Sequence, residues 1–392
     1  MKKEFTGILV FSLLAASCTR EASEIQIGKI NFSHNWEFTI PKDTVVHPGM
    51  FLKSDTALKW EAVDLPHTAR TEPLVITDNQ WQGTCFYRKF FQYNTAGKPA
   101  YVAIRFGAAM HEAEVFLNGR SLKVHQGGYL PFEVELTPYL REENCILVKL
   151  NNEDNPRIPP GKIIERLDFN YYGGLYREAF LINKKSVRFT HPAESFGRGA
   201  QGVMLSWYDI DTSGGKATLR LDAEIMNHSL EAIPAVCELE FHDPSGKIML
   251  EHRSEIFLVP ADSTYLYTTT FRMEKLKFWS PADPVLYKLN IRLESGNETA
   301  DNYSTRTGIR EIRFDSSGFT LNGRRTWIRG TNRHQEYPYI GYALSNQAQY
   351  RDARKIKDAG FDFVRLSHYP QAESFLDACD ELGLMVMDAI PG

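Results

Sequence analysis

Cysteine is scarce in this chain. Five cysteines occur among 392 residues, and four of them, Cys85, Cys145, Cys237 and Cys379, have neither metal-ligand spacing nor the spacing of a disulfide framework. We therefore expect these four to be small, buried, apolar residues. Cys379 lies inside a predicted helix, so a catalytic role for it is not expected.

An excess of charge of one sign is also missing. The 45 basic and 49 acidic side chains leave a formal net charge of -4. The chain has no basic stripe with interleaved aromatic residues, and its Lys and Arg clusters are short. This pattern excludes nucleic acid as an expected partner.

The apolar run at the N-terminus is too short to span a membrane. Residues 7–16 follow Lys2 and Lys3 and end in small residues before Cys18, which is typical of a secretory signal. The segment resembles a bacterial lipobox in which Cys18 becomes the lipidated first residue, although Ala15 and Glu4 depart from the usual pattern. We expect an exported protein, lipid-anchored in the periplasm or outer membrane; simple secretion is the alternative.

Hydrophobic residues make up 43% of the sequence, which is enough to form the cores of two or three domains. From 25 to 185, short alternating runs are separated by turn signals, and Asn118-Gly119 is a two-residue hairpin turn. This predicts an antiparallel β-sandwich of the jelly-roll kind. From 186 to 311, runs such as 217–225 and 236–241 predict an immunoglobulin-like β-sandwich.

The third region, 312–392, changes to strands that alternate with helices. The apolar run 327–330 leads into Asn332, Arg333 and His334, and a second run ends in Arg365 and His368. The segments 347–359 and 372–382 have helical periodicity and end at glycines, and 384–388 is a continuous apolar run. This order predicts a (β/α)₈ barrel, in which functional residues lie where each strand ends. Either histidine alone is equally well explained by an ordinary strand–helix unit with polar ends.

These phrases resemble a known family. The segments NRHQEYP (332–338) and FVRLSHYP (363–370), followed by CDELGLMVMD (379–388), are similar to the start of the catalytic barrel of glycoside hydrolase family 2. Phrases at 65–68, 81–88, 115–119 and 168–178 are similar to the family's sugar-binding domain. The resemblance implies a β-galactosidase, with a β-glucuronidase as the alternative within the enzyme class.

The resemblance also implies a set of substrate-binding residues. They are Asp168, on a loop that reaches the barrel mouth, and Asn332, Arg333, His334, Arg365 and His368. Carboxylate, imidazole and guanidinium groups suit a polyol because they accept or donate hydrogen bonds at hydroxyls. From the residues alone, Asp168 is better explained as a solvated loop acid or a partner of Arg166, and Arg365 is equally well explained by a structural ion pair.

Retaining hydrolysis needs two carboxyl groups about 5 Å apart. In the family both are glutamates on later strands, and no Glu here matches them; Glu336 is in the wrong loop and is expected to be structural. A barrel takes about 250 residues, so the sequence is expected to be incomplete and inactive by itself. No cofactor is implied, and Ala389 stands where related β-galactosidases carry a Glu that in some ligates Mg²⁺, so no metal is expected.

The predicted partner is therefore a β-linked oligosaccharide or glycoside, with a homo-oligomer possible for the complete protein. The rival from another class is a non-catalytic carbohydrate-binding protein or a truncated remnant. The retained barrel phrases argue against that rival, because a binding module has no use for them.

Overall fold

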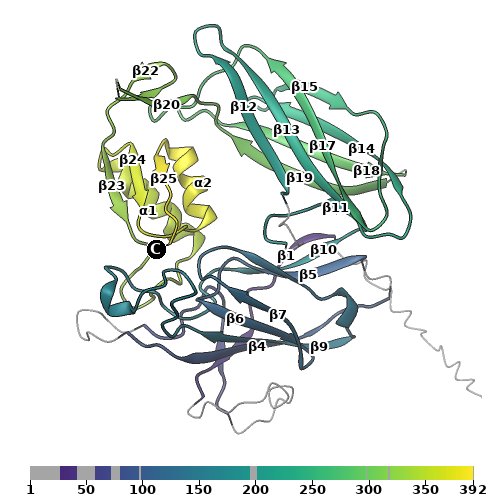
Figure 1. Ribbon diagram of the computed structural model, residues 1–392, viewed down its shortest axis with the longest axis vertical. Coiled ribbons are helices and arrows are strands. Elements are labelled where there is room, and N and C mark those ends of the chain that lie inside the picture. The colour runs from purple at the N-terminus through teal and green to yellow at the C-terminus, as the bar shows by residue number, and fades with distance from the viewer. Residues whose placement is uncertain are drawn as a thin grey trace, which may run out of the picture.

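The computed structural model describes residues 27–41, 58–71, 80–96, 99–194, 201–296, 298–316 and 318–391. Strands dominate these ranges, and the two α-helices found within them both lie in the last fifth of the chain. Figure 1 shows two β-sandwiches, one below the other, with the short parallel strands and both helices beside them. In the described part of the chain, no helix has the length and apolar character needed to cross a membrane.

The first sandwich consists of two antiparallel sheets. One has the order β1-β10-β5-β8 and the other β3-β2-β4-β9-β6-β7. The strands of the first sheet are β1 (Gly28–Asn31), β10 (Ala179–Lys184), β5 (Tyr101–Phe106) and β8 (Phe132–Glu135). Those of the second are β3 (Glu61–Val63), β2 (Trp36–Thr39), β4 (Thr84–Gln92), β9 (Glu143–Asn151), β6 (Glu112–Leu117) and β7 (Arg120–Gln126).

Alternating side chains from both sheets fill the core between them. Trp36, Ile104, Phe106, Val115 and Val148 are fully buried there. The predicted hairpin turn joins β6 to β7, and both Asn118 and Gly119 have positive φ, as a two-residue hairpin turn requires. Two short 3₁₀ helices, η2 (Thr137–Tyr139) and η3 (Ile164–Arg166), lie in the connections.

The second sandwich follows within a few residues. In one sheet β13 pairs with β11, β12 and β17, and the other has the order β15-β14-β18-β19 with β16 beside β14. The strands of the first sheet are β11 (Val187–Phe189), β12 (Val203–Asp211), β13 (Lys216–Asn227) and β17 (Ser263–Met273). Those of the second are β14 (Ile233–His242), β15 (Ile248–Arg253), β16 (Phe257–Val259), β18 (Tyr287–Ser295) and β19 (Glu298–Thr307).

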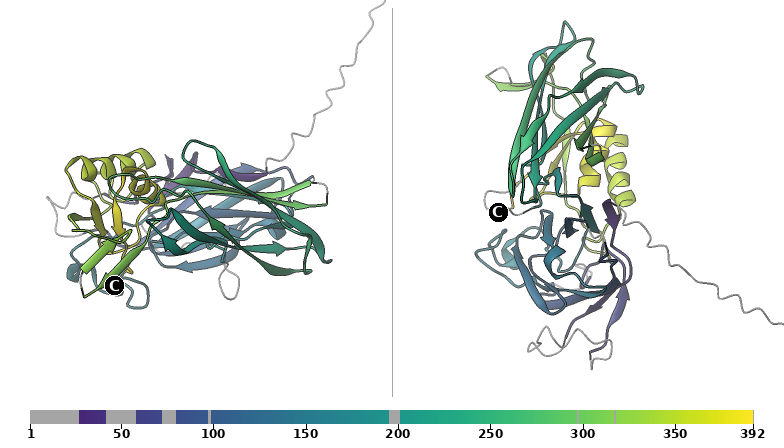
Figure 2. Two further views of the ribbon diagram at one scale, coloured as in Figure 1. Left: turned by 90° about the horizontal axis from the view of Figure 1, so that it is seen from above. Right: turned by 90° about the vertical axis from the view of Figure 1, so that its right-hand side faces the viewer.

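The last part begins with an antiparallel sheet of three short strands, β20 (Ile312–Asp315), β21 (Gly318–Leu321) and β22 (Arg324–Arg325). A parallel sheet follows, with the order β23 (Gly330–Arg333), β24 (Phe363–Leu366) and β25 (Met385–Met387). Helices α1 (Asn346–Asp358) and α2 (Glu373–Leu382) connect these strands, and Figure 2 shows them together on one side. This is the start of a (β/α)₈ barrel, as predicted.

The sequence misplaced the first barrel strand. We expected it in the apolar run at 327–330, but β23 begins at Gly330 and runs through the polar residues Thr331, Asn332 and Arg333. Trp327 is 80% exposed, and Ile328 packs with Trp279 of the second sandwich instead. The apolar run therefore anchors the approach to the strand rather than forming it.

The buried cysteines match the expectation, because Cys85, Cys145, Cys237 and Cys379 are all free and buried. Burial raises the pKa of Cys145 to about 11 and that of Cys237 and Cys379 to about 12. Thiols in this state are neutral at ordinary pH and poor nucleophiles. Cys18, the predicted lipidation site, lies outside the described residues.

Candidate active-site mouth

The ends of β23 and β24 place polar residues side by side. The parallel register sets Asn332 opposite Arg365, and Arg365 opposite Met387. These side chains share the face of the sheet that the helices do not cover. His334 follows the end of β23 and His368 follows the end of β24, so their rings meet with centroids 5.6 Å apart.

A chain of hydrogen bonds joins the barrel to the first sandwich. Arg365 Nη2 lies 3.2 Å from His368 Nδ1, and since a guanidinium only donates, that ring nitrogen must accept. The proton of a neutral His368 is then on Nε2, which lies 3.3 Å from Asp168 Oδ2. Arg365 also donates to Ser367 Oγ at 3.1 Å. Arg365 thus orients His368, and His368 holds the loop acid.

Asp168 projects from the first sandwich with 76% of its side chain exposed. Desolvation raises its pKa, but the hydrogen bond with His368, a local backbone N–H and the charges of His368 and His334 together lower it below its ordinary value. Its side-chain partner is His368 rather than Arg166. An ionised, exposed carboxylate has acceptor capacity left for neighbouring hydroxyls.

His334 is partly buried beside Phe169. The ring of Phe169 lies 6.0 Å from it in a stacked arrangement and 5.8 Å from the ring of His368. Burial lowers the pKa of His334, and the nearby carboxylates Glu336 and Asp168 do not reverse that shift. A neutral imidazole donates one hydrogen bond and accepts another, which suits contact with a hydroxyl.

Arg333 does not lie at this mouth, which corrects our prediction that it contacts substrate. Its side chain is 6% exposed and bonded to helix α1, with Nη2 at 2.8 Å from Gln349 Oε1 and 2.7 Å from Asp352 Oδ2. It also donates to Gln371 and lies over the ring of Phe375 at 4.0 Å. Successive strand residues point to opposite faces, so Asn332 is exposed on the open face while Arg333 is buried under the helices.

Sequence reasoning missed the residues that fix the loop after Asp168. Asn170 Nδ2 donates to Glu336 Oε2 at 3.0 Å, and Tyr342 donates to the carbonyl oxygen of Asn170. Glu336 is thus a support for the loop, as its expected structural role suggested. Phe169 and Asn170 directly follow Asp168 in the sequence, and that adjacency was the signal available.

An aromatic cluster under this loop joins the first sandwich to the barrel. Tyr369 is fully buried, stacks on Tyr129 with ring centroids 4.7 Å apart, and packs against Phe169. The buried members of the cluster are Ala108, Met110, Tyr129, Phe169, Tyr171, Tyr172, Tyr176, Tyr342 and Tyr369. Large rigid side chains therefore fix the position of the loop relative to the histidines.

Metal ligands do not gather at this mouth. Within the described ranges, no group of three or more His, Cys, Asp or Glu side chains is placed to hold a metal ion. Asp388, at the end of β25, accepts from the backbone N–H of Ala389 at 2.8 Å. The arrangement brings together instead a carboxylate, two imidazoles and a guanidinium, with the amide of Asn332 opposite Arg365 in the sheet.

Three family models match this chain consecutively. They describe the glycosyl hydrolases family 2 sugar-binding domain over residues 3–185, the glycosyl hydrolases family 2 domain over 205–310, and the family 2 TIM-barrel domain over 312–392. The chain belongs to glycoside hydrolase family 2. Its domain order and the architecture of all three parts are those predicted.

Individual relatives come from two enzyme classes of that family. A β-galactosidase of Thermoanaerobacter pseudethanolicus is 32% identical over 372 residues, covering 93% of this chain and 46% of the relative. A β-glucuronidase of Bacteroides fragilis is 26% identical and covers 99% of this chain and 52% of the relative. The chain spans about half the length of such relatives.

A solved structure shows the same fold. Bacteroides uniformis β-glucuronidase 2, covalently bound to cyclophellitol-6-carboxylate aziridine, superposes with a TM-score of 0.82 at 27% identity. The match covers 93% of this family 2 chain and 42% of that structure. The two sandwiches and the first barrel strands thus have their counterparts in an enzyme that was captured with a covalent ligand.

Proposed function

We propose that this family 2 chain forms the binding half of a retaining β-glycosidase that removes terminal β-galactosyl residues. The observation that carries the proposal is the chain of contacts from Arg365 through His368 to Asp168, which two domains supply. The β-galactosidase relatives support galactoside as the substrate. The β-glucuronidase relatives keep β-glucuronide as the second candidate.

In this proposal the residues of the mouth bind and orient the sugar. Asp168 accepts from sugar hydroxyls, and its bond to His368 keeps that ring in the tautomer with the proton on Nε2. His334, held neutral by burial, donates to a hydroxyl, and that bond strengthens as charge develops in an oxocarbenium-like transition state. The acid and the nucleophile are two glutamates from barrel strands outside this sequence.

The experiment compares the chain with a version extended to a closed barrel. We expect the 392-residue chain to release no p-nitrophenol from p-nitrophenyl β-galactoside or p-nitrophenyl β-glucuronide. The extended version should release p-nitrophenol faster from the β-galactoside than from the β-glucuronide. Release from the β-glucuronide alone would assign the second candidate. Turnover by the short chain would place the catalytic pair within it and overturn the proposal.

Substitutions in the extended version test the mouth directly. His334→Ala and His368→Ala should each lower kcat/KM by on the order of tenfold or more, the scale of one lost charge-assisted hydrogen bond. His34→Ala is the matched control, because His34 is exposed in the first sandwich and pairs with Asp64. Unchanged kinetics in both active-site variants would return these residues to a structural role.

Export and lipidation at Cys18 are also part of the proposal, supported by the sequence pattern of residues 1–18. Labelled fatty acid should enter the unaltered chain in a bacterial host and not the Cys18→Ser variant. Equal labelling of both would remove the lipid anchor from the proposal. We also keep the prediction that the complete protein forms a homo-oligomer, which a measurement of its mass in solution would test.

A further inference from the structure

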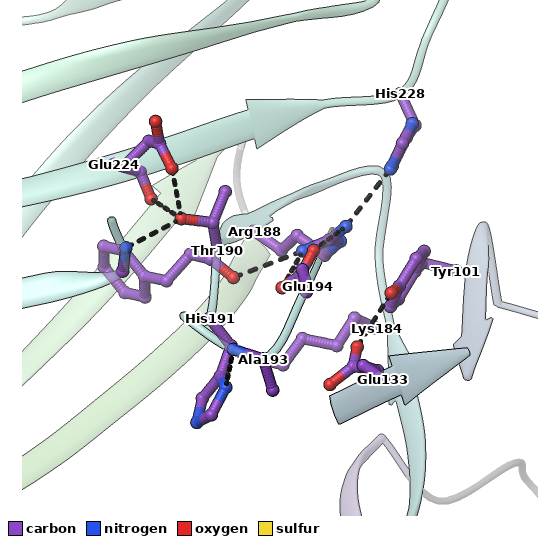
Figure 3. Close-up of polar contacts among 12 residues, drawn as sticks. Tyr101, Glu133, Lys184, Arg188, Thr190, His191, Ala193, Glu194, Glu224 and His228 are labelled. Atoms are coloured by element: carbon purple, nitrogen blue, oxygen red, sulfur yellow. Dashed lines mark hydrogen bonds and ion pairs between the residues drawn. The ribbon is translucent and has the colours of Figure 1, made fainter. Parts of the chain in front are cut away.

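The contact between the two sandwiches contains a fully buried charge. Arg188 of β11 has no exposed surface, and Glu194 is 5% exposed. The guanidinium holds Glu194 with both terminal nitrogens, at 2.9 Å from Oε1 and 2.8 Å from Oε2 (Figure 3). Its carbon lies 3.8 Å from the ring centre of Tyr101, which belongs to the first sandwich.

The loop that follows β11 is also bonded to the first sandwich directly. The backbone N–H of Glu133 in β8 donates to the carbonyl oxygen of Ala193 at 2.9 Å. Tyr101 donates to Glu133 Oε1 at 2.7 Å, and Arg105 donates to Glu133 Oε2 at 2.7 Å. The loop 190–194 is therefore docked on strand β8 rather than tethered loosely. We call this contact region, from Lys184 to Glu194 with Tyr101, Glu133 and His228, the joint.

Two histidines in the joint are placed as hydrogen-bond acceptors. His191 Nδ1 accepts from the backbone N–H of Ala193 at 3.0 Å and so shapes the turn that docks on β8. His228 Nε2 lies 3.2 Å from Arg188 Nη2, and since the guanidinium only donates, the imidazole nitrogen accepts. Both bonds, drawn in Figure 3, require the ring to be neutral. A protonated ring would put a donor against a donor at both places.

The charges that act most strongly on His191 oppose its protonation, while the carboxylates Glu178, Glu373 and Asp377 line the same cavity as its ring. Burial is the largest cause, and the charges of Arg105 on β5, Lys184 on β10 and Lys29 on β1 act in the same direction, which lowers the pKa of His191 to about 3. Lys184 itself is held in place by Asp301 of β19 at 2.6 Å. The three cations that act on His191 thus come from one sheet of the first sandwich, β1-β10-β5-β8.

The groups that face His228 are mixed in sign. Burial and Arg188 lower its pKa, while Glu135 and Asp262 act the other way without reversing the shift. Asp262 Oδ1 lies 3.9 Å from Nδ1, the nitrogen that carries the proton in the neutral ring. The ring is stacked on Tyr101 with an interplanar angle of 7° and a centroid distance of 5.7 Å. Its neutral form therefore bridges the two sandwiches.

We propose that the joint is an acid-sensitive lock, in which proton uptake by His191 and His228 releases the loop 190–194 from strand β8 and frees the two sandwiches to move relative to each other. Protonated His191 loses its bond to Ala193 and repels three cations. Protonated His228 repels Arg188. In the same direction, burial raises the pKa of Glu194, so that acid also weakens its pair with Arg188.

The direction of the pH effect on the joint follows from the coupling between proton binding and opening. Both histidines have a lower pKa in the closed joint than in the open one. The free energy that favours the closed joint is therefore at its full value above the ordinary imidazole pKa, and it decreases as the pH falls below that value. With an open-state pKa of about 6.5, the opening equilibrium should rise roughly tenfold between pH 7.5 and pH 5.5 through His191 alone. His228 adds to that rise.

Native-state hydrogen exchange with mass spectrometry, corrected for the intrinsic pH dependence of exchange, measures this opening. Peptides covering 187–194 and 132–135 should lose protection about tenfold or more between pH 7.5 and 5.5. A peptide from the centre of β13, 219–225, should keep its protection. A uniform loss through both sandwiches would mean general acid unfolding and would overturn the proposal.

The decisive variant is His191→Asn with His228→Gln, because these amides keep an acceptor oxygen near the imidazole nitrogen and do not titrate. It should hold the protection of 187–194 at pH 5.5, whereas the control His34→Gln should behave as the unaltered chain. Equal acid loss in the double variant overturns the proposal. If the double variant does not fold, the pH series of the unaltered chain decides alone, and constant protection of 187–194 overturns it.

Discussion

The two faces of the parallel sheet β23-β24-β25 differ in what covers them. One face packs on helices α1 and α2 with the fully buried Val364 and Leu366, and it also holds the paired Arg333. The other face presents Asn332, Arg365 and Met387 in one row, and Met387 is 49% exposed. Residues adjacent in the sequence therefore serve different ends: one set stabilises the fold, and the other is available for chemistry.

Arg333 and Asn332 give the strongest test of the difference between the two faces, because they are neighbours in the sequence but lie on opposite faces of the sheet. Arg333→Met should lower the free energy of unfolding by about 3 kcal/mol, since it leaves Asp352 without its cation in a buried place. Asn332→Ala should change it by less than about 0.5 kcal/mol. Urea denaturation followed by circular dichroism measures both. Similar losses in the two variants would contradict the assignment of faces.

Leu366 and Met387 test the same difference between the two faces with uncharged side chains. Leu366→Ala removes a fully buried side chain from the helix-covered face and should cost about 2 to 3 kcal/mol in the free energy of unfolding. Met387→Ala on the open face should cost less than about 1 kcal/mol. The measurement is again the urea midpoint at constant slope, and a larger loss at Met387 would show that the open face is packed in solution.

The smallest expected effect is a shift in the titration of His334, which lies at the edge of the open face. Because burial lowers its pKa, its imidazole should titrate below the ordinary range in an NMR pH series, and its contribution to stability is present above about pH 6.5 and lost as the pH falls. Phe169→Ala uncovers the ring and should move the midpoint back toward the ordinary value. Phe314→Ala, at a 71% exposed position elsewhere, should leave it unchanged.

Local patterns predicted the elements better than the site. The helices expected at 347–359 and 372–382 are α1 (Asn346–Asp358) and α2 (Glu373–Leu382), because an apolar stripe and a terminal glycine mark a helix without outside help. Strand β23 was misplaced because its residues are polar, and its partner strand decides where it begins. Short strands carry too little pattern of their own to fix their ends.

The error at Arg333 has a plain physical reason. The phrase Asn332-Arg333-His334 was treated as one polar group, but alternation along a strand separates its first two members. Asp168 could be named only through the family resemblance, since no local pattern links it to a residue 200 positions away. The stacking of Phe169 on His334 depends on that same long-range packing, and its one signal in the sequence was the adjacency of Phe169 to Asp168.

The contact between Asp168 and His368 also fixes an order of events during folding. The partners are 200 residues apart, and Asn170 and Glu336 are separated by 166. Domains that emerge from the ribosome fold as units, N-terminal ones first, and contacts of long sequence separation form late. We therefore expect the first sandwich to fold before the barrel strands are made, so that Asp168 pairs with His368 only late in folding.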